Sequence, residues 1–583
     1  MELLAPGAQG QTAEAYSETV EAFSSRSPDQ YLVSGSYYSN LGRLLRCPSP
    51  APPFLDPFCF VAVLDLSAPQ QNSNDGQPVD LARNFRELSN PSDYIQGPQI
   101  SANHSQLIFL RGHPSGAWLS TLGAALRVDP EFWRRHQVPA HRCEYHDLPP
   151  LPSFSSRSVQ LRVSTIFNCR TTVTRKAVED ARVDAREHIR KHHVELWRKG
   201  AAGDSVVRQL HAHSESIYSV EQHISCTVVT KNGGWAALIW QDIGKPISEI
   251  PWMAKPYPSN KNEPDYCTPI IQPTAKAALS HDPLDDDGRS SGIPPSVSEV
   301  QSSTQSSAFL ASPQYGTSLR ESLMCSSPLY ALSDIFRHSA CSSNQVLNML
   351  HQRVGDALRA ADRLESLSLA DLRFSKEVLD DRASYLQEVI NFLEGDAWLQ
   401  VRMTTSSSQS QVPRRPTNLS PTNSGSSSTL NLQGQSQQGG DQTPRRPSLI
   451  GDTKRGNGTA ESTQADLLED FRCLLRRTEK LSARCKDGTD IILSGAQLRE
   501  SQKAINQAEE VRLLTKLVFV FAPLSFLTSV FGMNFVTLRW QQGLPALLVS
   551  ALIIVFTLFV TFSESARRKL GEIISSMYYY RWR

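Results

Sequence analysis

Two long apolar runs near the C-terminus dominate the hydropathy pattern of the chain. Residues 513–531 contain one charge, Lys516, and residues 544–562 contain none. A helix needs roughly 20 apolar residues to cross a bilayer, so both runs predict transmembrane helices. Basic residues flank the two runs on the sides away from the loop 532–543. This asymmetry predicts an integral membrane protein with both ends of the chain, including the basic tail 563–583, in the cytosol.

Helical spacing of apolar residues continues upstream of the first run. From Gln464 onward it reaches the apolar run without a proline. This predicts a stalk helix over 465–512 that continues into the span 513–531 as one helix, on the order of 100 Å long at 1.5 Å per residue. Two further apolar stripes predict a helical hairpin over 336–400.

The region 51–255 mixes strand and helix signals. Short apolar runs occur at 58–66 and 107–110, and Lys231-Asn232-Gly233-Gly234 separates two strand-like runs as a hairpin turn would. The charged stretch 175–199 predicts an exposed helix. We therefore expect an α/β or α+β cytosolic domain, preceded by a flexible N-terminus over 1–50.

Composition changes this picture in two places. The 583 residues include 36 prolines, and only 39% are hydrophobic. The Pro- and Ser-rich stretch 256–335 predicts a flexible insertion, and 401–464 predicts a disordered linker because it has too little apolar surface to offset chain entropy. The formal charge of +1 argues against nucleic-acid binding. Ten scattered cysteines without a CxxC pair indicate a reducing compartment.

The first apolar run carries a face of small and weakly polar residues. A helix over this run places on one side Leu514, Val518, Ala522, Ser525 and Ser529. Such a face is typical of a helix–helix contact or of a pore lining. Pro523 predicts a kink, because it frees a backbone carbonyl.

The end of this run favours the pore. Gly532, Met533 and Asn534 follow it directly. A ring of Asn oxygens can hold a hydrated dication through its waters, which suits Mg²⁺ because this ion dehydrates reluctantly.

These residues resemble the CorA magnesium-transporter superfamily. Its pattern, LT…F-x-P-L-[ST]-F…[FY]-G-M-N-F, is matched by Leu514-Thr515, by residues 521–526 and by residues 531–535. The similarity covers about residues 505–570. The insertions elsewhere favour a divergent eukaryotic, fungal member.

The resemblance implies a homopentamer with one stalk helix per subunit around a central pore. It implies passive transport of divalent metal cations, chiefly Mg²⁺, with selectivity at Asn534 and without a cofactor or enzymatic activity. Leu514, Val518, Ala522 and Ser525 would line the pore. We expect the plasma membrane rather than an organelle.

A second interpretation stays open. The family usually carries acidic residues directly after its Gly-Met-Asn motif, whereas residues 535–539 contain none. The alternative is therefore a transport-inactive, membrane-anchored CorA-like signalling or scaffold protein. In the linker, Thr417 and Ser448 each follow an Arg-Arg-Pro sequence and are candidate phosphorylation sites, although a basic tether near the membrane explains the arginines equally well.

Other polar residues carry weaker signals. We assign no cation sensor to the acidic residues of the predicted hairpin and stalk, which include Asp371, Asp380 and Asp381, because they fit a solvated helix face. His188 and His192 lie on a basic helical stretch, which predicts that both side chains are exposed. Ser214 lacks the sequence context of a hydrolase nucleophile.

Overall fold

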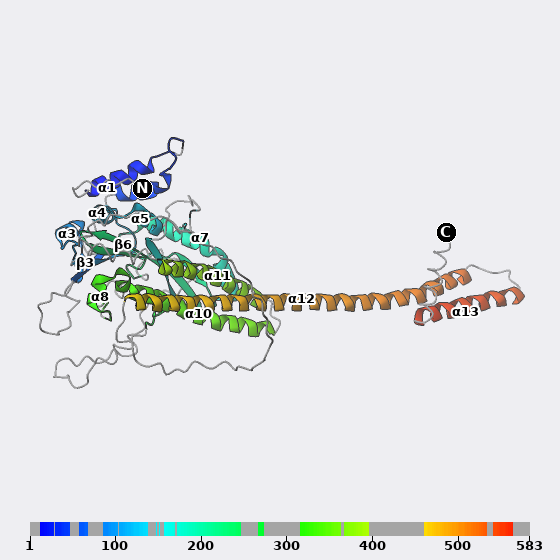
Figure 1. Cartoon of the computed structure of the whole chain (residues 1–583). Helices are drawn as coiled ribbons and strands as arrows, with labels where there is room; N and C mark the ends of the chain where they lie inside the picture. The colour runs from blue at the N-terminus through cyan, green and yellow to red at the C-terminus, as the bar shows by residue number, and fades with distance from the viewer. Residues whose placement is uncertain are drawn as a thin grey trace, which may run out of the picture. The chain divides into compact units, whose positions relative to one another are not determined.

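The structure is a computed structural model that describes most of the chain (Figure 1). The described residues are 12–46 except 28, 58–67, 85–137 except 103, 147, 151, 157–246 except 170 and 171, 266–272, 315–395 except 317 and 363–366, 460–532, and 540–563. The chain divides into two compact units, Met1–Ala360 with Ala370–Cys485, and Ala361–Leu369 with Lys486–Arg583.

The described strands of the first unit form one eight-stranded mixed sheet. Its order is β2-β1-β3-β7-β6-β4-β8, and β5 also pairs with β6. Among the strand pairs that the structure describes, only β3–β7 is parallel. The strands are β1 (Val61–Ser67), β2 (Phe85–Leu88), β3 (His104–Arg111), β4 (Ser158–Asn168), β5 (Gln209–Ala212), β6 (Ile217–Lys231), β7 (Gly234–Gln241) and β8 (Tyr266–Thr268). The expected turn joins β6 to β7, with Asn232 and Gly233 at positive φ.

Helices pack on the sheet through two separate hydrophobic core clusters. The α3 helix (Pro91–Gln96) contacts β2 and α4. One core cluster joins β1, β3 and β7 to α1 (Ala13–Ser24), α2 (Ser39–Arg46), α4 (Gly116–Leu126) and α5 (Pro130–His136). A second joins β4, β5 and β6 to α7 (Arg175–Lys199) through Val178, Ala181 and Ile189. The first unit thus contains an α/β structure, as the mixed signals predicted.

The described part of the predicted flexible N-terminus, residues 12–46 except 28, is more ordered than its sequence predicts. It contains α1, a 3₁₀ turn η1 (Ser36–Tyr38) and α2, and both helices pack on α4. Tyr16 is buried, its hydroxyl donates to the Val128 carbonyl at 2.9 Å, and it accepts from Trp133 Nε1 at 3.0 Å. A Cβ at Gly123 would lie 2.4 Å from the Tyr16 ring, so this glycine permits the contact. The partners lie more than 100 residues away, which local sequence patterns do not reveal.

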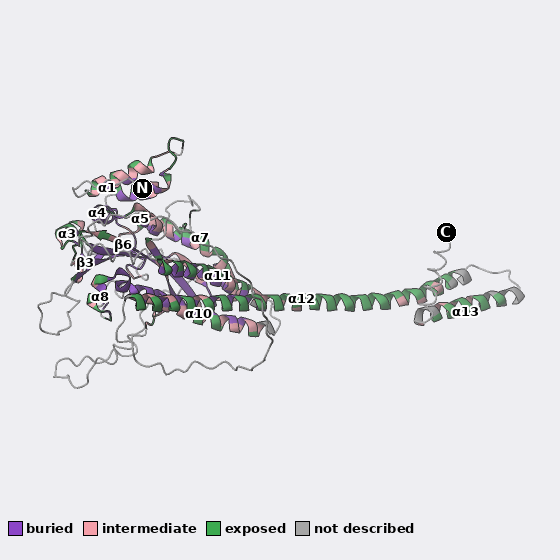
Figure 2. Cartoon of the chain, in the orientation of Figure 1, coloured by how far each residue is buried: buried purple, intermediate pink, exposed green. Residues whose placement is uncertain are grey.

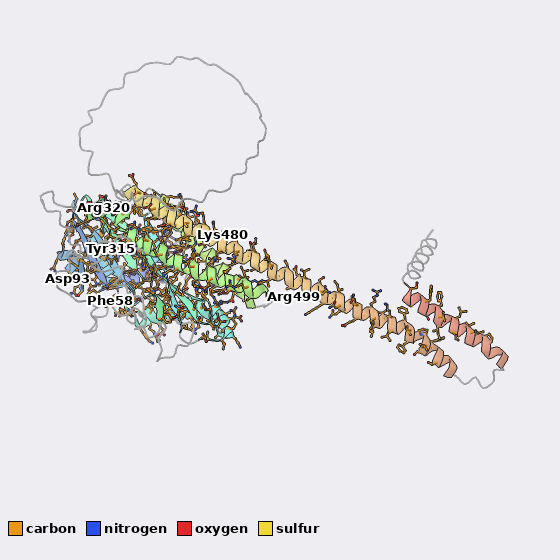
Figure 3. The ribbon with its side chains drawn as sticks, turned by 90° about the horizontal axis from the view of Figure 1, so that it is seen from below. Phe58, Asp93, Tyr315, Arg320, Lys480 and Arg499 are labelled. Atoms are coloured by element: carbon orange, nitrogen blue, oxygen red, sulfur yellow. The ribbon has the colours of Figure 1, made fainter. Side chains whose placement is uncertain are left out.

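The region 256–335, predicted as a flexible insertion, also contains ordered elements. These are β8, α8 (Glu321–Ser326) and α9 (Pro328–Ala331), whereas 273–314 lies outside the described residues. Tyr315, labelled in Figure 3, packs against Phe109 with the ring centroids 5.2 Å apart, and its hydroxyl donates to the Ala331 carbonyl at 2.7 Å. Trp235 Nε1 donates to the Cys325 carbonyl at 2.8 Å. Aromatic anchors on the sheet therefore order this segment.

Two long helices cover the outer edge of β4. They are α10 (Ser333–Asp362) and α11 (Leu367–Glu394), within the region predicted as a helical hairpin. Ser342 Oγ accepts from the Ser164 amide at 2.7 Å and donates to its carbonyl at 3.0 Å. Tyr385 Oη accepts from the Arg162 amide at 3.0 Å. Hydroxyl groups thus take the place of a neighbouring strand along this edge.

The longest helix belongs to both units. The α12 helix (Ala460–Gly532) has 73 residues, and its first part packs against α10 and α11. Phe471 lies edge-on to Phe336 with centroids 6.4 Å apart, and Gln464 Nε2 donates to the Leu393 carbonyl at 2.6 Å. The helix begins four residues before Gln464, and the predicted linker upstream of Ala460 lies outside the described residues.

The second unit contains the rest of α12 and α13 (Trp540–Phe562). Figure 2 colours most of this part of α12 as exposed, in contrast to the buried cores of the first unit. The exposed residues include large apolar side chains such as Leu498, Ile505 and Phe519.

Candidate functional site

The five residues predicted to line a pore all lie on α12. Leu514 and Val518 are 63% and 57% exposed, and Ala522, Ser525 and Ser529 are exposed as well. Residues on other sides of the helix are equally open, with Phe526 at 69%. A contiguous apolar surface of this kind marks a site that contacts other molecules.

Pro523 lies inside α12, and the helix continues through it. Because proline has no amide hydrogen, the Phe519 carbonyl lacks its usual helical donor. The threonine hydroxyls nearby bond within their own helix, Thr515 to the Val511 carbonyl at 2.7 Å and Thr528 to the Ser525 carbonyl at 2.9 Å. The hydroxyl hydrogens of these two threonines are therefore used within α12.

The described part of α12 ends at Gly532, the first residue of the Gly-Met-Asn motif. Met533 and Asn534 lie outside the described residues, as do the following residues up to 539. The role of Asn534 therefore stays a prediction. Thr417 and Ser448 also lie outside the described residues.

A search of the described residues for membrane spans finds no helix that combines the required length and apolar character. The described residues likewise hold no group of three or more His, Cys, Asp or Glu side chains arranged to bind a metal ion.

Three of the acidic residues considered as cation sensors already have partners. Asp371 lies 2.6 Å from Arg175 and 2.8 Å from Arg182. Asp381 lies 2.6 Å from Arg162. A metal ion at either carboxylate would have to displace a guanidinium.

Asp380 is held in the same way. It pairs with Lys376 and accepts from Ser482 Oγ of α12 at 2.6 Å. Although burial alone would raise the pKa of Asp380, these hydrogen bonds hold that pKa below its usual value. Glu388 differs, because desolvation of its carboxylate raises its pKa. The structure thus assigns the paired carboxylates structural roles.

Several histidines are more buried than the sequence predicts. His192, predicted as exposed, is 1% exposed, because its position on α7 faces the sheet, whereas His188 is partly exposed. His213 Nε2 lies 2.9 Å from Ser219 Oγ rather than activating Ser214.

The structure also forms a Ser–His–Asp arrangement that no sequence motif indicates. His136 Nδ1 lies 2.8 Å from Ser225 Oγ, and its Nε2 lies 3.2 Å from Asp242. All three residues are at most 5% exposed, and Asp242 also pairs with Arg208 at 2.7 Å. A nucleophile needs access to substrate, so this buried chain of contacts stabilises the domain. His136 lies 89 residues before Ser225, so no local motif could reveal the arrangement.

A comparison with protein families identifies a known domain in the C-terminal part of the chain. Residues 453–563 match the family model described as CorA-like Mg²⁺ transporter protein. The chain carries a CorA-like domain. A search among curated proteins finds no match. The matched CorA-like domain includes all of α12 and α13 and begins upstream of the residues that carried the resemblance.

The CorA-like domain confirms the family predicted from the Gly-Met-Asn region. The description of this family names Mg²⁺ transport, which suggests transport of divalent cations. The match covers 111 of the 583 residues, so the α/β domain lies outside it.

Proposed function

We propose that this protein forms a passive channel for divalent cations, chiefly Mg²⁺, built from several copies of the chain. Five copies of α12 would surround the pore. Leu514, Val518, Ala522, Ser525 and Ser529 would face it, and a ring of Asn534 side chains would select the hydrated ion. No nucleotide or other cofactor enters this mechanism.

The observation that carries the proposal is the continuity of α12. One helix contains both Phe471, buried among α10 and α11, and the apolar segment that ends directly before Met533 and Asn534. Because a helix transmits displacement along its axis, a change in the first unit could bias the state of the apolar segment.

Membrane insertion of the two apolar runs is part of the proposal. Lys516 is the only charged residue in 513–531, and 544–562 has none. In the single chain most of the described apolar side chains here are exposed. Lipid or neighbouring subunits would cover them, and Lys516 could extend its ammonium to the interface. We place both ends of the chain in the cytosol and favour the plasma membrane.

The test is Mg²⁺ influx into proteoliposomes that contain an entrapped indicator. We compare the wild type with Asn534→Ala and with the matched control Asn506→Ala, whose side chain is exposed on α12 outside the apolar run. We expect influx in the wild type and the control, driven by the gradient alone, and its loss or loss of ion selectivity in Asn534→Ala. Equal influx in all three proteins would refute a selectivity ring at Asn534.

The acid-poor loop favours a second candidate. Residues 535–539 contain Arg539 and no carboxylate, so the loop would not concentrate cations at a pore entrance. The protein would then be a membrane-anchored CorA-like scaffold without transport. Well-folded wild-type protein that passes no Mg²⁺, Co²⁺ or Ni²⁺ under any driving force would establish this candidate instead.

A further inference from the structure

A second Ser–His–Asp arrangement lies where β1 ends beside the start of β3, and this one reaches the surface. Ser67 Oγ lies 3.4 Å from His104 Nδ1, and His104 Nε2 lies 3.2 Å from a carboxylate oxygen of Asp65. Ser67 is exposed, whereas the side chains of His104 and Asp65 are 17% and 9% exposed. The three residues thus lead from a buried acid to an accessible hydroxyl, unlike the arrangement at Ser225, which is buried throughout.

The pairing register of β1 with β3 brings these side chains together. The two strands are antiparallel, with Ser67 opposite His104 and Asp65 opposite Gln106. Residues directly opposite each other share one face of a sheet, and so do residues two apart on one strand. The backbone of the sheet therefore places the hydroxyl, the imidazole and the carboxylate on the same face.

The contact with Asp65 determines which nitrogen of His104 carries the proton. A carboxylate only accepts hydrogen bonds, so His104 Nε2 donates its N–H to Asp65. In the neutral ring Nδ1 then carries an unprotonated lone pair, and Nδ1 is the nitrogen that faces Ser67 Oγ. This orientation allows His104 to remove the proton from the Ser67 hydroxyl.

Two further donors hold Asp65 in place. Gln106 Nε2 donates at 2.9 Å to the same oxygen as His104, and Arg86 Nε donates at 2.7 Å to the other oxygen. Gln106 is fully buried, and its Oε1 accepts from Tyr94 Oη at 3.1 Å. Within the described part of the chain, Asp65 is the only carboxylate that pairs with His104. Because Arg86 balances its charge, Asp65 acts on His104 mainly by orienting the ring.

We propose that Ser67 is a nucleophile for small carboxylic esters, with His104 as its general base and Asp65 as a positioning residue. Ser67 Oγ attacks the ester carbonyl carbon while its proton passes to His104 Nδ1. The bond from this carbon to the alcohol oxygen then breaks, and the alcohol leaves with that proton. Water, deprotonated by His104, hydrolyses the acyl-Ser67 ester, which releases the carboxylic acid and restores the hydroxyl. An ester fits better than an amide because its alcohol is the better leaving group.

The site can be tested on the full-length protein in detergent micelles with a fluorophosphonate probe. Attack by Ser67 Oγ on the phosphorus atom forms an O–P bond and expels fluoride, and the adduct is stable. Digestion and mass spectrometry then measure the labelling rate of each serine. Ser89 is the control within the same protein, because it is also exposed at the end of a strand, β2, and its Oγ lies 3.7 Å from Cys59 Sγ rather than beside a histidine.

We expect labelling of Ser67 to be at least about tenfold faster than that of Ser89, because only Ser67 has a general base. His104→Gln should slow the labelling of Ser67 by about a hundredfold, since a general base contributes at least this much. Imidazole added to His104→Ala should recover part of the rate. Asp65→Asn should lower the limiting labelling rate by about tenfold or more through loss of the correct tautomer, and leave the half-saturating probe concentration unchanged. Ser67→Ala should hydrolyse 4-nitrophenyl acetate more slowly than the wild type.

Two results would overturn the proposal. One is labelling of Ser67 no faster than that of Ser89 in the wild type. The other is an unchanged labelling rate of Ser67 in His104→Gln. The first comparison is made within the wild-type protein, so it decides the question even if a variant does not fold. None of these readouts depends on ion transport, so the nucleophile can fail while the channel proposal stands.

Discussion

Removing one hydroxyl from α11 should loosen the edge of the sheet. Tyr385 is 1% exposed, and its Oη accepts from the Arg162 amide at 3.0 Å and lies 2.8 Å from Ser339 Oγ. Tyr385→Phe keeps the ring, which packs beneath the Arg162 guanidinium with Cζ 5.0 Å from the centroid. The change therefore isolates the hydroxyl.

The expected change in the free energy of local opening comes from the Arg162 amide, which loses its acceptor in Tyr385→Phe. The carbonyl of Arg162 retains the hydrogen bond from Ser339 Oγ at 2.7 Å, but its N–H loses its acceptor. An unsatisfied buried donor is unfavourable by about 1–3 kcal/mol. We take about 1.4 kcal/mol because Arg162 is only partly buried, which corresponds to about a tenfold increase in local opening.

Hydrogen exchange of the β4 peptide, followed by mass spectrometry on the full-length protein, measures this opening. We expect about tenfold faster exchange at Arg162 in Tyr385→Phe. The control is Tyr266→Phe, since Tyr266 is 39% exposed and its hydroxyl has no partner among the described residues. Unchanged exchange at β4, or equal effects in the two variants, would refute the idea that hydroxyl groups close this edge.

Three further outcomes can be checked by standard methods. Gly123→Ala should destabilise the first unit by more than about 2 kcal/mol in denaturant unfolding, because its Cβ would lie 2.4 Å from the Tyr16 ring of α1. Gly495→Ala, whose Cβ would meet nothing within 4 Å, should instead stabilise α12 by about 0.5–1 kcal/mol. Burial lowers the pKa of His338 to about 4. Its neutral form therefore favours folding above about pH 6.5, this contribution is lost as pH falls toward 4, and His338→Met should flatten the stability profile in that window. In native protein a maleimide should label the exposed Cys473 and leave the buried Cys226 unmodified, because burial raises the pKa of the Cys226 thiol. Mass spectrometry after digestion measures the labelling of both residues, and equal labelling would contradict the burial of Cys226.

The C-terminal elements could be predicted from the sequence because their signals are local. Helical periodicity repeats every few residues, so the pattern from Gln464 onward located α12 to within four residues of its start at Ala460. The Gly-Met-Asn motif is contiguous, and the family match over 453–563 confirms the resemblance built on it. The roles of Met533 and Asn534 in ion selection stay predictions.

The N-terminal helices and the segment around Tyr315 could not be predicted in the same way. Their order depends on single aromatic anchors whose partners are distant in sequence, such as Tyr16 with Trp133 and Tyr315 with Phe109. A short amphipathic helix is marginal by itself and is stabilised by the surface that it covers. Composition alone therefore underestimated the order of both regions.

The sequence by itself determined the long helix, its apolar continuation and the family motif, since each depends on neighbours within a few residues. Only the tertiary structure decided which polar residues are buried and what they contact. Ser342 and Tyr385 meet the backbone of β4 across 178 and 223 residues, and Arg382 reaches Ser164 across 218. A hydroxyl or guanidinium that bonds to a distant partner leaves no periodic signal in the sequence, because its position is set by how the helices pack on the sheet.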